Sequence, residues 1–152
     1  MNMKKLITVI IAVVALTTAH AQKISSSKVP SAVTSAFKKM NPDVKSVSWE
    51  IEDGTYEANY KKNGMPSSSN YDKNGNLIES EVEIKVKDLP VSVPDYIKTH
   101  YKSGIKEASK ITKSNGEVNY EAMVNNVDVI FDANGKYLKE VKEETEAKEK
   151  KQ

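Results

Sequence analysis

The pentapeptides YDKNG (residues 71–75) and FDANG (residues 131–135) stand 60 residues apart and set the plan of this chain. Upstream of each lies the tripeptide Tyr-Glu-Ala, at residues 56–58 and 120–122, and before that a Val-Pro or Leu-Pro pair, at residues 29–30 and 89–90. The same order of features twice predicts an internal repeat with a period near 60. The two Tyr-Glu-Ala tripeptides are 64 residues apart, and this even drift keeps equivalent side chains on the same face of a strand.

The turns between the repeated features predict the sheet. Five of the six glycines follow Asn or Asp, a pairing that makes tight hairpin turns because both residues tolerate a positive φ. Asn125-Asn126 supplies a sixth turn, so each unit has three turns and therefore four antiparallel strands. The strands alternate as a half-buried sheet requires, with Val47, Trp49 and Ile51 on one face.

Each unit begins with an amphipathic helical pattern. The apolar stripe consists of Val33, Ala36, Phe37 and Met40 in the first unit and of Val93, Ile97 and Tyr101 in the second. Helix caps are expected at Ser25 to Ser27 and at Ser92, and helix ends at Asn41-Pro42 and at Gly104.

The predicted fold is therefore α+β, with two tandem repeats, each an N-terminal helix packed on a four-stranded antiparallel meander sheet. The repeats are expected at residues 22–87 and 88–142. Units of about 60 residues bury little apolar surface alone, so we expect them to share a core or a continuous sheet, joined by a long strand within residues 77–86.

Residues 1–21 have the pattern of a signal peptide: Lys4 and Lys5, an apolar run over residues 6–16, and Ala19-His20-Ala21 before the cleavage point. The run is shorter than the ~20 residues that a membrane-spanning helix needs, and no cysteine follows it for lipid attachment. We expect a periplasmic or secreted protein that does not insert into a membrane after cleavage. Residues 143–152 are expected to form a charged flexible tail.

Composition excludes several classes of function. The sequence has no cysteine, all 23 of its basic residues are lysines, and removal of residues 1–21 leaves 21 lysines against 21 acidic residues. A balanced chain without arginine lacks the basic surface that nucleic acids require, so no nucleic-acid partner is expected. Nothing indicates a cofactor.

Catalytic and metal-binding motifs are also lacking. Asp72 and Asp132 begin segments similar to the start of a calcium loop, but the later ligand positions do not fit, and an Asp that caps a hairpin turn explains them better. His100 is interpreted as a helix-surface histidine without a partner motif. We therefore predict no metal site, no catalytic residues and no enzyme activity.

The motifs together resemble the PepSY-like family of exported Bacteroidetes proteins, whose fold is similar to the tandem domains of the beta-lactamase inhibitor protein. The resemblance rests on VPxxVxxxFxxxxP (residues 29–42), VxWE (47–50), the two YEA tripeptides, YDxNG and FDxNGK (131–136), and it covers about residues 28 to 141. The second unit has no tryptophan to match Trp49; Lys110 or Ile111 is expected near that position.

The predicted function is an exported non-catalytic binding or inhibitor-like module that presents a sheet surface to a protein or envelope component. Met123 and Ile130 have the parity of the polar strand face and are expected to be exposed there, beside acidic residues. The candidate partner-binding residues are Glu50, Glu57, Asn59, Glu121, Met123, Asp128 and Ile130. The alternative is a small-ligand carrier with an apolar pocket between helix and sheet, beneath Phe37 and Trp49; a hydrolase is the third class considered.

Overall fold

The computed structural model describes residues 22–52 and 54–142. The predicted signal peptide and tail lie outside these residues. Within them, nine strands form one antiparallel sheet in the order β1 to β9, accompanied by two α-helices. The first half comprises β1 (Gln22–Ile24), α1 (Ser31–Met40), β2 (Val47–Glu52), β3 (Thr55–Lys62), β4 (Met65–Tyr71) and β5 (Leu77–Ile84). The second comprises α2 (Ser92–Tyr101), β6 (Glu107–Lys113), β7 (Val118–Val124), β8 (Val127–Asp132) and β9 (Tyr137–Lys142).

The two halves are joined by the sheet. Strand β5 pairs with β4 on one side and with β6 on the other, so the expected long connecting strand is present and the sheet is continuous. The α+β class and the helix followed by four antiparallel strands in each half agree with the prediction. Strand β1 was not predicted; it adds a ninth strand beside β2.

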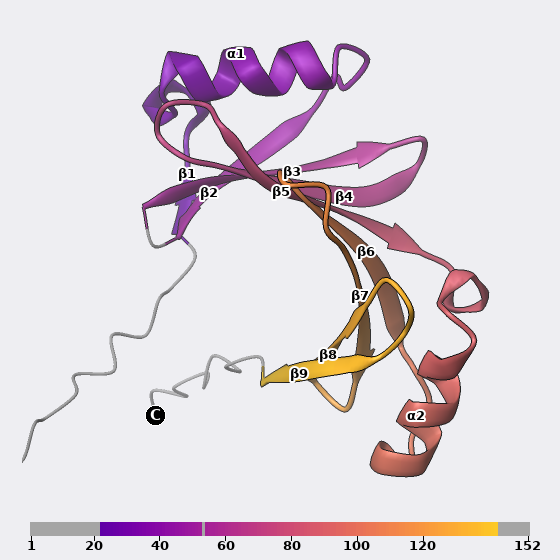
Figure 1. The fold of residues 1–152 in the computed structure, drawn as a ribbon. Coiled ribbons are helices and arrows are strands. Elements are labelled where there is room, and N and C mark those ends of the chain that lie inside the picture. Colours follow the sequence, from indigo (N-terminus) through magenta and orange to yellow (C-terminus); the bar gives the residue numbers. More distant parts are fainter. Residues whose placement is uncertain (1–21, 53, 143–152) are drawn as a thin grey trace, which may run out of the picture.

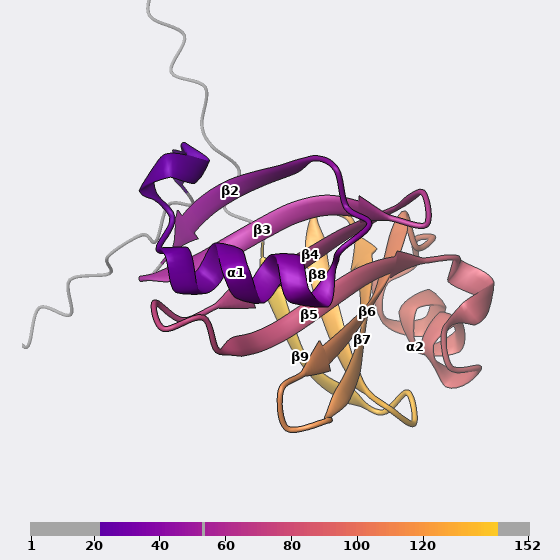
Figure 2. The same ribbon diagram turned by 90° about the horizontal axis from the view of Figure 1, so that it is seen from above.

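The helices cover one face of the sheet and leave the other open. Figure 1 shows the sheet bending between its two halves, with α1 and α2 both on the outer side of the bend. Figure 2 shows α1 lying across the first-half strands and α2 set apart beside β6 and β7. We call the inner, helix-free side the concave face.

Two apolar clusters lie between the sheet and its helices. In the first, Phe37 of α1 packs edge-to-face against Trp49 and Tyr60, with ring centroids 5.5 and 5.0 Å apart. The second gathers α2 residues such as Val93 and Ile97 against β6, β7 and β8. The halves thus share a sheet and keep separate cores.

The expected replacement for Trp49 in the second half was wrong. Trp49 pairs with Ala58 of the first Tyr-Glu-Ala tripeptide, and the residue that pairs with Ala122 of the second is Ala108, not Lys110 or Ile111. The register of the strands, which spacing between motifs does not fix, decides this equivalence.

Three of the expected helix ends also differ. Residues Ser26–Lys28 form a separate 3-10 turn, and α1 begins after Pro30 without a side-chain cap. Ser92 does not cap α2; its hydroxyl donates instead to the carbonyl of Gly135, 3.0 Å away. Helix α2 ends at Tyr101, and the left-handed residue that follows it is Lys102, with φ 50°, rather than Gly104.

The repeated turns after β4 and β8 hold the helices in place. A Cβ added to Gly75 would lie 2.5 Å from the carbonyl oxygen of Ala32, in the first turn of α1, and one added to Gly135 would collide with the Ser92 hydroxyl at the start of α2. Each of these two glycines, which occupy the same position in the repeat, thus lies where a hairpin turn contacts the start of a helix. Only glycine leaves the room for that contact.

Candidate functional site: the concave sheet face

Strand pairing places all seven candidate partner-binding residues on the concave face. Glu50 lies opposite Glu57, Glu121 opposite Ile130, and Met123 opposite Asp128. Asn59 shares their parity, since it is two residues from Glu57 on the same strand. The residues between them on each strand, such as Ala58 and Val129, are buried beneath the helices.

The expected exposure of the two apolar candidates was wrong for Ile130. Its side chain is only 6% exposed, and Met123 is half-buried. Ile130 lies on β8 between Glu121 of β7 and Lys139 of β9, so the longer side chains of both adjacent strands flank it on this face. Ile130 therefore belongs to the floor of the concave face rather than to its contact surface.

A cavity of about 320 Å³ lies on this face and spans the junction between the two halves. It draws on β3, β4, β5 and β6, and thus on both sides of the β5–β6 pairing. Its lining residues are Glu57, Asn59, Tyr60, Pro66, Ser67, Ser68, Glu81, Glu83, Glu107 and Ser109. Four of the ten are glutamates and none is a lysine.

Sequence reasoning found Glu57 and Asn59 but missed Glu81, Glu83 and Glu107. The signal was present in the segment ESEVEI (residues 79–84), where glutamates alternate with residues of the helix-covered face. What the pattern could not reveal is that β5 lies in the middle of a continuous sheet, where its glutamates meet acidic residues from the other half.

Glu81 shows the electrostatic consequence. Burial raises the pKa of its carboxyl group above the ordinary value, and the nearby carboxylates of Glu57, Glu79 and Asp128 raise it further, while a hydrogen bond with Ser109 lowers it. Desolvation and like charge both disfavour the ionised form. Acidic residues from the two halves are therefore close enough to repel one another.

Asn119 is a buried polar residue on the same face. It pairs with Ile111, which in turn pairs with Glu81, and its side chain is 6% exposed. Its Nδ2 donates to Glu117 Oε1 at 3.3 Å, whereas its Oδ1 has no hydrogen-bond partner among the described residues. Buried carbonyl oxygens are normally paired, so this acceptor could receive a hydrogen bond that the described residues do not supply.

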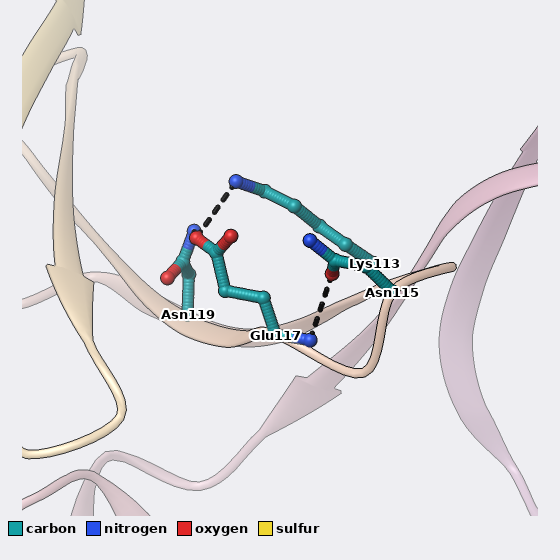
Figure 3. Close-up of polar contacts among 4 residues, drawn as sticks. All are labelled: Lys113, Asn115, Glu117 and Asn119. Carbon is teal, nitrogen blue, oxygen red and sulfur yellow. Dashed lines mark hydrogen bonds and ion pairs between the residues drawn. The ribbon is translucent and has the colours of Figure 1, made fainter.

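Figure 3 shows the polar contacts that fix this corner of the sheet. Lys113 Nζ forms an ion pair with Glu117 Oε1 at 2.8 Å, and the backbone N–H of Glu117 donates to Asn115 Oδ1 at 2.9 Å. The pair lowers the pKa of the Glu117 carboxyl group. The charge of Lys113 is therefore paired with Glu117 at the turn between β6 and β7.

Metal binding has no support in the described residues. No group of three or more His, Cys, Asp or Glu side chains there could hold a metal ion. Asp72 acts as the expected turn cap: its Oδ1 accepts from the backbone N–H groups of Asn74 and Asn76, and its Oδ2 accepts from Asn76 Nδ2. Asp132 Oδ1 accepts equivalently from the N–H groups of Asn134 and Lys136.

His100 lies on the outer surface of α2, as its position in the sequence predicted. Its ring stacks on Tyr96 with centroids 3.9 Å apart, and its Nδ1 lies 2.9 Å from the Tyr96 carbonyl. These contacts make it part of a surface aromatic stack.

In the part of the chain that the structure describes, no helix is long and apolar enough to cross a membrane.

Solved structures with the same fold come from Bacteroides. A protein from Bacteroides eggerthii that is described as periplasmic is 16% identical with a TM-score of 0.64, over 74% of this chain and 88% of its own. A BLIP-like protein from Bacteroides fragilis is 23% identical with a TM-score of 0.58, over 74% of this chain and 85% of its own. At these identities the likeness establishes the fold.

No functionally curated protein matches the chain. The family model described as beta-lactamase-inhibitor-like, PepSY-like matches in two overlapping segments, residues 15–79 and 56–139. The first segment contains the turn at residues 72–75, and the second, which begins within β3 and ends within β9, contains both Asp-x-Asn-Gly turns. The chain belongs to the beta-lactamase-inhibitor-like, PepSY-like family.

Proposed function

We propose that this protein is an exported, non-catalytic module that binds a protein partner on its concave sheet face. The proposal is carried by the placement of the helices. Both helices lie on the outer side of the bent sheet, so the inner side is not covered by a helix, and polar and charged side chains line a cavity there. A concave surface can receive a protruding part of another protein, and its charged side chains favour a partner of complementary charge.

Export is supported by the signal-peptide pattern in residues 1–21 and by the description of a structural relative as periplasmic. The family's likeness to beta-lactamase inhibitors supports a role in binding rather than catalysis. The lining of the cavity contains no histidine or cysteine, and no group of side chains in the described residues could hold a metal ion.

Site-specific photo-crosslinking tests the proposal. A photoreactive amino acid at Asn59 on the concave face should crosslink a discrete partner in the cell envelope, and the same amino acid at Lys98, which is exposed on α2, serves as the matched control. A partner captured from position 59 but not from position 98 would support the concave face. Equal capture from both positions, or capture from position 98 alone, would contradict it.

A second candidate function rests on a different hollow. A cavity of about 620 Å³ lies beside α2 and includes Val86, Ile97 and Ile105. It is the best candidate for the apolar pocket of a small-ligand carrier, because Phe37 and Trp49 are 3% exposed and pack directly on each other instead of enclosing a pocket. Native mass spectrometry of the purified protein tests carriage: a stoichiometric bound lipid would favour it over the protein-binding role.

A further inference from the structure

The concave face carries an imbalance of charge that the net charge of the chain conceals. By strand register, its acidic residues include Glu50, Glu57, Glu79, Glu81, Glu83, Glu107, Glu121, Asp128 and Asp132. The lysines of the same parity are Lys23, Lys61, Lys113 and Lys139. Lys113 is already paired with Glu117, and none of these lysines lines the cavity at the junction of the two halves.

The cavity has the size and chemistry of a pocket for one long cationic side chain. Its volume of about 320 Å³ is large enough to hold one lysine or arginine side chain. Glu81 and Glu83 approach it from β5 and Glu107 from β6, while Ser68 and Ser109 add hydroxyl groups. Carboxylates converging from different strands favour an ammonium or guanidinium group, which can contact several of them at once.

The environment of Glu81 favours a cation in the cavity, and a second polar group on the same face lacks a donor. The ionised form of Glu81 is disfavoured by burial and by its acidic neighbours, so a cation placed among them would relieve a cost that the folded chain carries alone. Asn119 lies on the same face two strands from Glu81, outside the lining of the cavity, and its buried Oδ1 accepts no hydrogen bond from the described residues. A donor on the bound partner would satisfy it.

We propose that the cavity between β3 and β6 receives a lysine or arginine side chain from a protruding loop of the protein partner. This inference rests on the proposed function, because it names the chemistry of the surface that the concave face binds. Complementary charge recessed in a partly desolvated pocket would select among partners and speed their association.

A peptide titration tests the pocket directly. The mature chain, labelled with ¹⁵N, is titrated with the blocked peptide acetyl-Gly-Gly-Lys-Gly-Gly-amide and with the same peptide carrying norleucine in place of lysine. We expect saturable shifts of the amide signals of Ser68 and Ser109 with the lysine peptide alone, and weaker binding as salt is raised from 50 to 300 mM. Absence of saturation, or equal shifts with norleucine, would overturn the proposal.

A pair of charge-matched double variants locates the effect. Glu83→Gln with Glu107→Gln removes two charges from the cavity, whereas Asp88→Asn with Asp95→Asn removes two exposed charges at the start of α2. The cavity variant should weaken lysine-peptide binding about tenfold, corresponding to about 1.4 kcal/mol, and the control should not. Equal weakening by both would show that only net charge matters and would overturn the pocket.

Three further outcomes distinguish this inference from other occupants of the cavity and from the proposed function. If spermidine binds at the cavity and the lysine peptide does not, a free polyamine is the occupant and the protein side chain is excluded. If photo-crosslinking from Asn59 captures a partner and the cavity variant captures it equally well, the protein-binding function stands and the cationic pocket fails. If crosslinking captures nothing from the concave face, the proposed function itself fails.

Discussion

Gly75→Ala and Gly64→Ala are a matched pair that measures how much the hairpin tips contribute to holding the helices. Both glycines have nearly the same positive φ, 83° and 82°. Around Gly64 an added Cβ would meet no heavy atom within 4 Å, whereas at Gly75 it would lie 2.5 Å from the Ala32 carbonyl oxygen and 2.8 Å from its carbon. The two substitutions therefore share the conformational cost and differ in the steric one.

The expected magnitudes follow from this difference. A left-handed conformation costs a residue other than glycine about 1–2 kcal/mol, so Gly64→Ala should lower the free energy of unfolding by that amount. Gly75→Ala adds a clash with helix backbone, which cannot rotate away as a flexible side chain could, and overpacking of this kind costs a further ~1–3 kcal/mol. For a chain of this size the additional loss corresponds to a melting temperature lower by about 4–12 °C than that of Gly64→Ala.

Urea denaturation followed by circular dichroism, together with thermal melts, measures both variants against the parent. A loss of stability at Gly75 that exceeds the loss at Gly64 would support direct contact between the hairpin tip and α1. Equal losses would refute it, because they would mean that the turn conformation alone accounts for the glycine and that the helix is held only by its apolar stripe.

Three further predictions concern the core and the concave face. Trp49→Ala should lower the free energy of unfolding by about 3–5 kcal/mol, because Trp49 is 3% exposed and packs on Phe37; an unchanged value in urea melts would contradict that packing. Ile130→Lys should lower the free energy of unfolding by more than about 2 kcal/mol and Met123→Lys, at a half-buried position, by less, measured in the same way; the opposite order would contradict the burial of Ile130. Glu81→Gln should raise the melting temperature at pH 7, because folding raises the pKa of the Glu81 carboxyl group and therefore disfavours its ionised form. Below the unfolded pKa of 4.5 the carboxyl group is protonated in both states and does not destabilise the fold. As pH rises through the folded pKa the group ionises and stability is lost. The advantage of the glutamine variant should therefore shrink below about pH 4.5, and an advantage that stays constant from pH 4 to 7 would exclude titration of Glu81 as its cause.

Much of the secondary structure was predictable because its signals are local. Asn-Gly dipeptides specify tight turns through the φ angles of two adjacent residues, and Asn63, Asn125 and Asn126 indeed have φ values of 52°, 52° and 61°. The alternation along each strand likewise assigned the seven candidate residues to one face correctly. Helix starts were predicted less well. Ser92 was expected to cap α2, but its hydroxyl donates a hydrogen bond to the carbonyl of Gly135, 43 residues away.

The sequence by itself determined the elements, their repeat and the face that each side chain occupies, because these depend on neighbours within a few residues. The tertiary structure alone decided that β5 pairs with β6, that the resulting sheet bends toward its helix-free side, and that Ile130 is covered while Glu57, Glu81 and Glu107 gather around one cavity. Burial and electrostatic repulsion act between groups that are close in space, and residues on β3 and β6 become close only when the two halves join in one sheet. No local pattern in the sequence indicates that residues of β3 and β6 lie close together.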